Sequence, residues 1–292
     1  MTLIATARRT IGLLPFLLAC LPVDDRPPPA RVVVAVTVDQ NLAEGITTTD
    51  GWSIRYDRFL VSLGAVSLDP PSSSLGPPSS SPPSETSRCT EYAPAFYVRI
   101  LDLLKPSPQT LRTAYGLGEC TLRFELGDPG AFSSLVSNVD EDVERFMREP
   151  RPDAFAFGGI VLSVAGTATR AGTTLSFDWS FRQAFGYETC DPISLEGDAS
   201  WTFEIQIQSR FLFHDRLDHE TAQVVFDPYA AADGNGDGQI TLEELGQVPV
   251  SDGTEFATLA ERLYLGLVPQ LPWFQGQPPC VFYRFGPKDP PI

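Results

Sequence analysis

Hydrophobic residues run together, or alternate with polar ones, over strand-length segments in the first two thirds of the chain. Val32–Val38 is a run of β-branched residues and one alanine, which predicts a buried strand. In the segment 201–213, Phe203, Ile205 and Ile207 alternate with polar residues, a pattern typical of a strand with one face in water. Further strands are expected at residues 58–63, 96–103, 121–126, 160–169 and 174–182.

About seven strands separated by turn residues predict a mainly β fold, an antiparallel β-sandwich, with a barrel as the alternative. We expect this antiparallel β domain to cover residues 32–216. Within it, residues 70–84 contain six prolines and seven serines, which predicts a disordered insert between two strands. From residue 217 to residue 292 the pattern changes to a helical segment with loops and a C-terminal tail.

Two amphipathic helices stand out. The first is expected after Asn138 as its N-cap, with Glu141 at the capping-box position. The second is expected after Asp252 as its N-cap, and its apolar stripe should pack against the β domain. The stripe of the first helix contains Val139, Val143 and Phe146, and that of the second contains Phe256, Leu259, Ala260, Leu263 and Leu267.

The N-terminus has the form of an export signal. Arg8 and Arg9 precede an apolar run, 11–19, that is too short to span a bilayer and ends at Cys20. The sequence Leu-Leu-Ala-Cys at 17–20 resembles the bacterial lipobox. That resemblance implies removal of residues 1–19 as a lipoprotein signal peptide and lipidation of Cys20, with residues 20–31 as a proline-rich tether. A plain secretory signal peptide is the alternative.

Composition narrows the classes of partner. The 292 residues include 21 Lys and Arg against 37 Asp and Glu, which gives a net charge of −16. Such a surface repels phosphate backbones, so no nucleic-acid partner is expected. After residue 20, no apolar stretch is long and charge-free enough to cross a membrane. We therefore expect a bacterial cell-envelope protein attached to a membrane through its lipid, with an unknown protein or glycan as its ligand.

The cysteines agree with an oxidising compartment. Apart from Cys20, the chain contains four: Cys89, Cys120, Cys190 and Cys280. An even number in an exported chain predicts two disulfides, for which three connectivities are open. Proximity in sequence favours the pairs Cys89–Cys120 and Cys190–Cys280.

Residues 233–244 carry the most specific motif. They read Asp-Gly-Asn-Gly-Asp-Gly-Gln-Ile-Thr-Leu-Glu-Glu and resemble the EF-hand calcium loop at every diagnostic position. Calcium takes oxygen ligands at about 2.3–2.6 Å, and a chain can supply them only by curling around the ion. Gly238, at the sixth position, permits the positive φ of that curl, and Ile240 should point into the core. The expected ligands are Asp233, Asn235, Asp237, the backbone carbonyl of Gln239, Thr241 through water, and Glu244.

The helices on either side of this loop are expected to be short. Asp227 is predicted to cap a first helix of about one turn, with Pro228 in its first turn. Thr241 and Glu244 satisfy a capping box for the helix that follows the loop. No second consensus loop is found, so a structural ion is favoured over the groove-opening switch of paired EF-hands. An ordinary Asp- and Gly-rich turn is the alternative.

The remaining constellations are weaker. His214 and His219, the two histidines of the chain, lie next to Asp215 and Asp218, and this grouping favours a polar strand-to-helix turn. A second metal site at the two histidines, for copper, is the alternative. A pair of aromatic residues, Trp273 and Phe274, can stack on a sugar or cover a core edge.

The sequence identifies no catalytic residue, because it lacks a GxSxG elbow, a phosphate loop and an HExxH helix. The strand-rich body followed by one EF-hand-like loop resembles uncharacterised secreted bacterial lipoproteins, and that resemblance implies no activity. We expect a calcium-stabilised binding or interaction module rather than an enzyme. An envelope copper-binding protein and a hydrolase without a recognisable motif are the alternatives.

Overall fold

The computed structural model describes residues 27–71, 88–89, 98–130, 138–150, 158–251 and 255–279, and the backbone of 281–285. The export signal and most of the Pro/Ser-rich insert lie outside these residues. The strands are β1 (Ala30–Val38), β2 (Ile46–Thr47), β3 (Ser53–Asp69), β4 (Val98–Asp102), β5 (Gln109–Gly116), β6 (Gly118–Leu126), β7 (Leu162–Arg170), β8 (Thr173–Phe181), β9 (Ala184–Glu188), β10 (Ile193–Leu195), β11 (Ser200–Ile207), β12 (Gln239–Ile240), β13 (Pro272–Phe274) and β14 (Val281–Phe285). The helices are α1 (Gln40–Glu44), α2 (Glu141–Arg148), α3 (Asp227–Ala230), α4 (Leu242–Leu245) and α5 (Leu259–Glu261), with 3₁₀ turns η1 (Ser209–Phe213) and η3 (Val268–Gln270) and a π-helical turn η2 (Arg262–Leu267).

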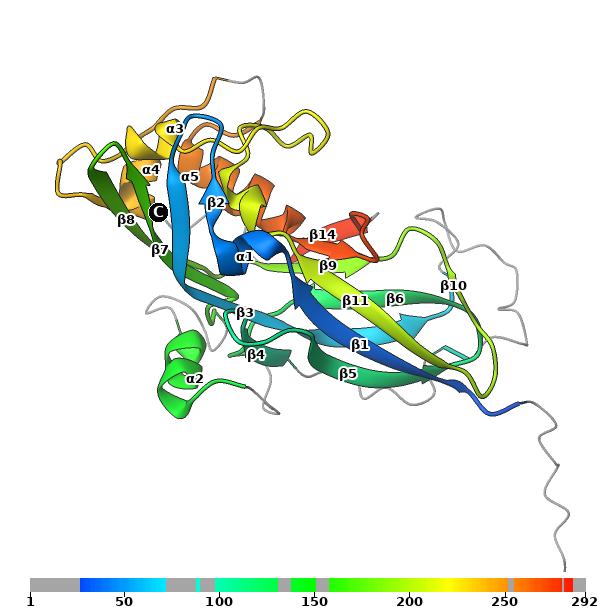
Figure 1. The fold of residues 1–292 in the computed structure, drawn as a ribbon. Helices are drawn as coiled ribbons and strands as arrows, with labels where there is room; N and C mark the ends of the chain where they lie inside the picture. The colour runs from blue at the N-terminus through cyan, green and yellow to red at the C-terminus, as the bar shows by residue number, and fades with distance from the viewer. Residues whose placement is uncertain are drawn as a thin grey trace, which may run out of the picture.

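The strands form two sheets that share one hydrophobic core (Figure 1). The smaller sheet has four strands in the order β13-β11-β1-β5, and the run Val32–Val38 forms its buried strand β1, as predicted. The expectation of a purely antiparallel arrangement is wrong, because β1 and β11 run parallel, with Val34 opposite Phe203. A parallel pair needs a long connection, and here most of the larger sheet is inserted between its two strands.

The larger sheet, which has ten strands in the described part of the chain, is organised by β3. This strand of 17 residues pairs with β7 along its first half and with β6 along its second half. The register of β3 shifts between Tyr56 and Arg58 in its pairing with β7, and between Gly64 and Ser67 in its pairing with β6. Such bulges bend and twist a strand. Because β12 joins β8 in parallel, this sheet is mixed too. Among the described strands neither sheet closes on itself, so the barrel alternative is not found.

The segment 201–213 begins as predicted and then changes. β11 keeps Phe203, Ile205 and Ile207 in the core, while Glu204 is exposed. The strand ends at Ile207, and the chain continues as the 3₁₀ turn η1, so the predicted strand is too long. The reason is that Phe211, Leu212 and Phe213 are all buried, and three consecutive side chains cannot share one face of a strand.

Both predicted helices form with different N-terminal residues. In α2 the cap is Asp140, which accepts from the backbone N–H of Val143 at 2.9 Å; Asn138 instead accepts from the N–H of Asp102 at 2.9 Å. The second helix begins after Thr258 rather than after Asp252, which lies outside the described residues. The predicted apolar face of α2 is confirmed, since it packs against a small buried cluster. In the second stripe Leu259, Ala260, Leu263 and Leu267 belong to the main core, whereas Phe256 is buried but lies before the helix begins. In the described part of the chain, no helix has the length and apolar character needed to cross a membrane.

The predicted disulfide between Cys89 and Cys120 is confirmed, with the two Cα atoms 5.5 Å apart. It ties the segment before β4 to strand β6. Cys190 is disulfide-bonded as well, and its expected partner Cys280 lies outside the described residues.

Trp179, on β8, lies at the centre of the core that both parts of the chain share. Its fully buried ring stacks on Phe177 with centroids 4.6 Å apart and packs against Phe213 and Tyr229. Tyr229 belongs to α3, so the C-terminal segment completes the core of the β domain instead of packing as a separate body. Figure 1 shows α3, α4 and α5 gathered around the end of the β7–β8 hairpin.

Candidate metal centre

The helix that enters the EF-hand-like loop is fixed by a carboxylate from the other end of the sequence. Asp50, in the turn between β2 and β3, accepts hydrogen bonds from the backbone N–H groups of Phe226 and Asp227, each at 2.7 Å. The prediction that Asp227 caps this helix is therefore wrong. Its own side chain instead accepts from the indole N–H of Trp52 at 2.9 Å and pairs with Arg170 at 2.7 Å.

Arg170 completes this junction between α3 and the large sheet. Its guanidinium lies 4.5 Å from the centre of the Trp52 ring, a cation–π contact, and donates to the backbone carbonyl of Asp50 at 2.9 Å. Sequence reasoning missed Asp50, Trp52 and Arg170, because nothing local to residues 226–227 indicates partners so far away in the chain.

The middle of the loop is paired to β8. The N–H of Ser176 donates to the carbonyl of Gly238 at 2.8 Å, and the indole N–H of Trp179 donates to the carbonyl of Ile240 at 2.9 Å. Ile240 is fully buried, as predicted from its place at the eighth position of the motif. The loop therefore has one strand-like edge that is part of the β framework.

The curl predicted for the loop is present. Gly238 has φ +78° and Gly236 has φ +72°, both in the left-handed region that glycine adopts most easily. The carboxylate of Asp233 spans the curl, because its Oδ2 accepts from the N–H of Gly238 at 3.1 Å. The first and sixth positions of the motif are thus held together by the protein itself.

The exit from the loop is the predicted capping box. The hydroxyl of Thr241 accepts from the N–H of Glu244 at 3.1 Å, while Oε2 of Glu244 accepts from the N–H of Thr241 at 2.9 Å and from its hydroxyl at 2.9 Å. One oxygen of the closing glutamate and the hydroxyl of Thr241 are therefore engaged in starting α4. The second oxygen of Glu244 is left for another partner.

Apart from Thr241, whose hydroxyl is engaged in the capping box, the predicted ligands fall into two groups. Oδ1 of Asp233 and Oε1 of Glu244 are buried atoms with no hydrogen-bond partner. Asn235 and Asp237 are exposed and bond to each other, and Gln239 is exposed on β12. Among the described residues, no three Asp, Glu, His or Cys side chains lie close enough together to hold a metal ion. The structure thus turns the end carboxylates inward and leaves the middle side chains in solvent.

The unpartnered oxygens fit a hard cation. A buried carboxylate oxygen without a donor carries an unfavourable desolvation energy, which a cation can offset. The atoms at issue are oxygens at the first and twelfth positions, and oxygen is the ligand atom that calcium prefers. Asp237 and Asn235 are exposed, so their side chains can turn toward an ion without disturbing the core.

The two histidines lie together in an aromatic cluster. His214 is 3% exposed, its ring centroid lies 6.1 Å from that of His219, and Phe211 packs against both. Burial lowers the pKa of His214 to about 4, with the nearby His219 and Arg210 acting in the same direction. Burial also lowers the pKa of His219. Both imidazoles are therefore neutral at pH 7.

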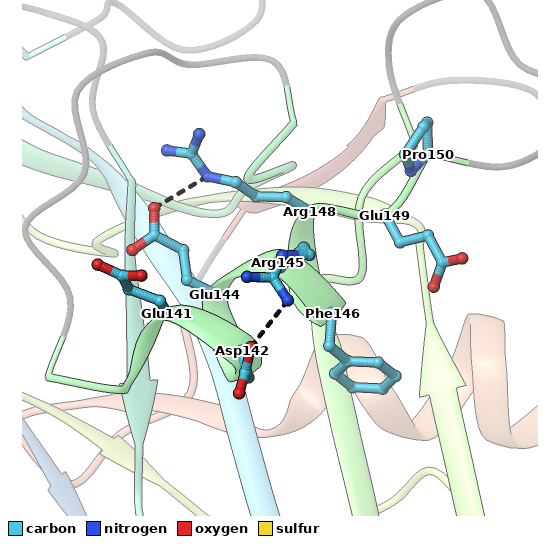
Figure 2. A pocket seen from close by; sticks show the side chains of 8 residues that line it. All are labelled: Glu141, Asp142, Glu144, Arg145, Phe146, Arg148, Glu149 and Pro150. Atoms are coloured by element: carbon cyan, nitrogen blue, oxygen red, sulfur yellow. Dashed lines mark hydrogen bonds and ion pairs between the residues drawn. The ribbon is translucent and has the colours of Figure 1, made fainter.

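A cavity of about 870 Å³ in the described region lies along α2 (Figure 2). Its charged side chains pair along the helix: Arg145 with Asp142 at 2.8 Å and Arg148 with Glu144 at 3.3 Å. The described part of its lining comes from one helix and the two residues after it, and these side chains alone form no catalytic grouping.

Comparisons with known proteins assign no family to the chain, so its function is argued from this geometry. No family model matches the chain, and neither the curated proteins nor the solved structures contain a significant match.

The carboxylate of Asp50 gives a test of how the loop is fastened. Burial acts to raise the pKa of Asp50, but the hydrogen bonds from Thr48 and from the N–H groups of Asp227 and Phe226 outweigh it and hold the pKa below its ordinary value. We expect Asp50→Asn to lower the free energy of unfolding at pH 7 by about 1–3 kcal/mol, the range for a charged hydrogen bond.

Thermal unfolding measures this effect, and Asp57→Asn is the matched control, because Asp57 is exposed on β3 and the change in charge is the same. A depressed pKa stabilises the fold at pH values above the ordinary carboxylate value, and this contribution is lost as the pH falls below about 4. The difference between Asp50→Asn and the parent should therefore shrink in acid. Equal melting temperatures for the two variants at pH 7 would show that the fastening is not needed.

Proposed function

We propose that the protein is a calcium-stabilised binding module, in which residues 233–244 hold one structural calcium ion. The ligands are Asp233, Asn235, Asp237, the backbone carbonyl of Gln239, Thr241 through water, and Glu244. The observation that carries the proposal is the pair of buried, unpartnered carboxylate oxygens at the first and last of these positions. They occur at the positions where the EF-hand pattern requires ligands.

The charges of the loop favour a cation for a second reason. Asp233, Asp237 and Glu244 lie within twelve residues, with Glu243 beside them, in a chain of net charge −16. Like charges on a fixed framework repel one another, and the pairing of β12 with β8 limits how far the loop can open. Calcium removes this repulsion and closes the loop, which stabilises the native state by mass action.

The surroundings of the loop support a structural ion rather than a switch. α3 and α4 have four residues each, too short to form the groove that sensor EF-hands expose. Tyr229 on α3 and Leu245 on α4 are fully buried in the common core. Calcium at this loop therefore braces the end of the β7–β8 hairpin.

Export and anchoring complete the proposal. Cys20 follows Leu-Leu-Ala after a short apolar run, and the Cys89–Cys120 disulfide is of the kind that persists in oxidising compartments. We place the protein in the bacterial cell envelope, tethered to a membrane by lipid on Cys20. A lipid-anchored module of this kind meets extracellular calcium, for which affinities of about 10⁻⁴–10⁻³ M are sufficient.

The ligand surface of this module is an aromatic row at the edge of the small sheet. Trp201 is 38% exposed and lies nearly parallel to Phe203, at an interplanar angle of 9°. Phe203 is only 7% exposed, so it supports the row from the core, and it stacks on Phe274. Beside the row is a cavity of about 280 Å³ with exposed Asp191 and Gln277 on its rim. Flat apolar rings beside hydrogen-bonding side chains suit a sugar, which has an apolar face and hydroxyl groups.

The calcium site predicts a shift in thermal stability. At a calcium concentration one hundred times the dissociation constant, binding adds about 2.7 kcal/mol, which raises the melting temperature by roughly 5–10 °C. We expect this rise in calcium relative to chelator, and we expect Asp233→Asn and Glu244→Gln to abolish it. Glu243→Gln is the matched control, because Glu243 is exposed, adjacent to the closing ligand and outside the ligand set. Identical melting curves in chelator and in ten millimolar calcium would refute the proposal.

The lipid anchor predicts that the full chain, expressed in a bacterium, incorporates labelled fatty acid and sediments with membranes. Cys20→Ala should remove both the label and the membrane association while leaving the protein exported. Label retained in Cys20→Ala would contradict the anchor, whereas loss of export would indicate that the change disturbs the signal itself.

The aromatic row predicts glycan binding that depends on Trp201. We expect Trp201→Ala to remove the retardation of the protein in gels containing envelope polysaccharide, and to leave the calcium-dependent melting shift unchanged. Tyr115→Ala is the control, since Tyr115 is an aromatic residue of similar exposure, 39%, on β5. Absence of retardation for the parent protein would remove glycan as the ligand class.

A further inference from the structure

The cluster around Phe211 contains more unpaired polar atoms than a hydrophobic core normally tolerates. Nδ1 of His214, Nδ1 of His219 and Nε1 of Trp273 are all buried and have no hydrogen-bond partner. The rings are in mutual contact. The ring centroid of His219 lies 4.4 Å from that of Phe211 and 5.5 Å from that of Trp273, and the centroid of His214 lies 4.5 Å from that of Phe211. A buried polar atom without a partner costs free energy, so this arrangement calls for a ligand.

We infer that His214 and His219 form a second, independent metal site that binds one cuprous ion, Cu(I), between two imidazole nitrogens. The separation of the ring centroids, 6.1 Å, matches the length that this coordination requires. Two metal–nitrogen bonds of about 2.0 Å, with about 1.1 Å from each nitrogen to its ring centre, give roughly 6 Å for a linear arrangement.

The number of ligands selects the ion. Zinc in proteins is almost always four-coordinate, and the carboxylates nearest in sequence are engaged elsewhere. Asp215 accepts from the N–H of Gln223 at 2.8 Å and from Arg216, and Asp218 accepts from the hydroxyl of Thr221 at 2.7 Å. Cu(I), a closed-shell ion, is satisfied by two nitrogen ligands in a line.

The charge of the ion matters as well. The site lies among apolar rings. The guanidinium of Arg210 is close by, 5.6 Å from the centre of the Phe211 ring. Moving an ion out of water costs more for a dication than for a monocation, and a neighbouring guanidinium repels a dication more strongly. Neutral ligands beside a fixed positive charge therefore favour Cu(I) over Cu(II) or Zn(II).

The test is titration of the full chain with Cu(I), kept reduced by ascorbate without oxygen, against a chromophoric cuprous chelator at pH 7. It is made in the Cys20→Ser background, because thiolates bind Cu(I) strongly. We expect one equivalent of bound copper. His214→Gln and His219→Gln should each weaken binding at least about 100-fold, more than the loss of an outer-shell partner. Glu243→Gln should bind copper as the parent does, because Glu243 is exposed and lies outside both proposed ligand sets.

X-ray absorption of the copper-loaded parent keeps the test independent of how the variants fold. The expected spectrum has two nitrogen neighbours with the outer-shell scattering of imidazole. Sulfur neighbours, copper retained by both histidine variants, or no binding by the parent at micromolar Cu(I) would each overturn the proposal.

Discussion

The position of the EF-hand-like loop depends on its attachment to the edge of β8. Two residues of β12 pair with that strand, and the buried indole of Trp179 donates to the carbonyl of Ile240. A buried carbonyl must be paired, and here the partner is the side chain around which the aromatic core is packed. The loop cannot leave β8 without exposing that core. Any free energy gained by closing the loop on an ion is therefore passed directly to the β framework.

In this attached loop, the two oxygens of each end carboxylate have different hydrogen-bond environments. The protein uses Oδ2 of Asp233 to hold the curl and Oε2 of Glu244 to start α4, which leaves one oxygen of each carboxylate unpaired. The half of each carboxylate that shapes the backbone is satisfied by N–H groups. The other half has no partner among the described residues. In the calcium site that we propose, shaping the loop and binding the ion therefore fall to different atoms of the same side chains.

Local patterns predicted what local physics determines. The capping box of Thr241 and Glu244, the positive φ of Gly238 and the one-sided burial of β11 each follow from a few neighbouring residues. The parallel pairing of β1 with β11 and the capping of α3 by Asp50 join residues more than 160 positions apart. Only the complete fold creates such partners, and the local sequence therefore points to Asp227 as the cap of α3.

The two proposed metal sites differ in the charge of their ligands and in their surroundings, and these differences select different cations. The loop offers charged oxygens, of which Oδ1 of Asp233 and Oε1 of Glu244 are buried and those of Asp237 exposed, and such oxygens suit a hard dication that keeps many ligands. The histidine cluster offers neutral nitrogens among aromatic rings, where a dication has too few ligands to replace its hydration. Calcium thus gains nothing at the imidazoles, and Cu(I) gains little from carboxylates. Both sites nevertheless lie against one core, because Phe213, next to His214, packs on Trp179. Each ion would therefore stabilise the same aromatic framework from a different side while binding independently.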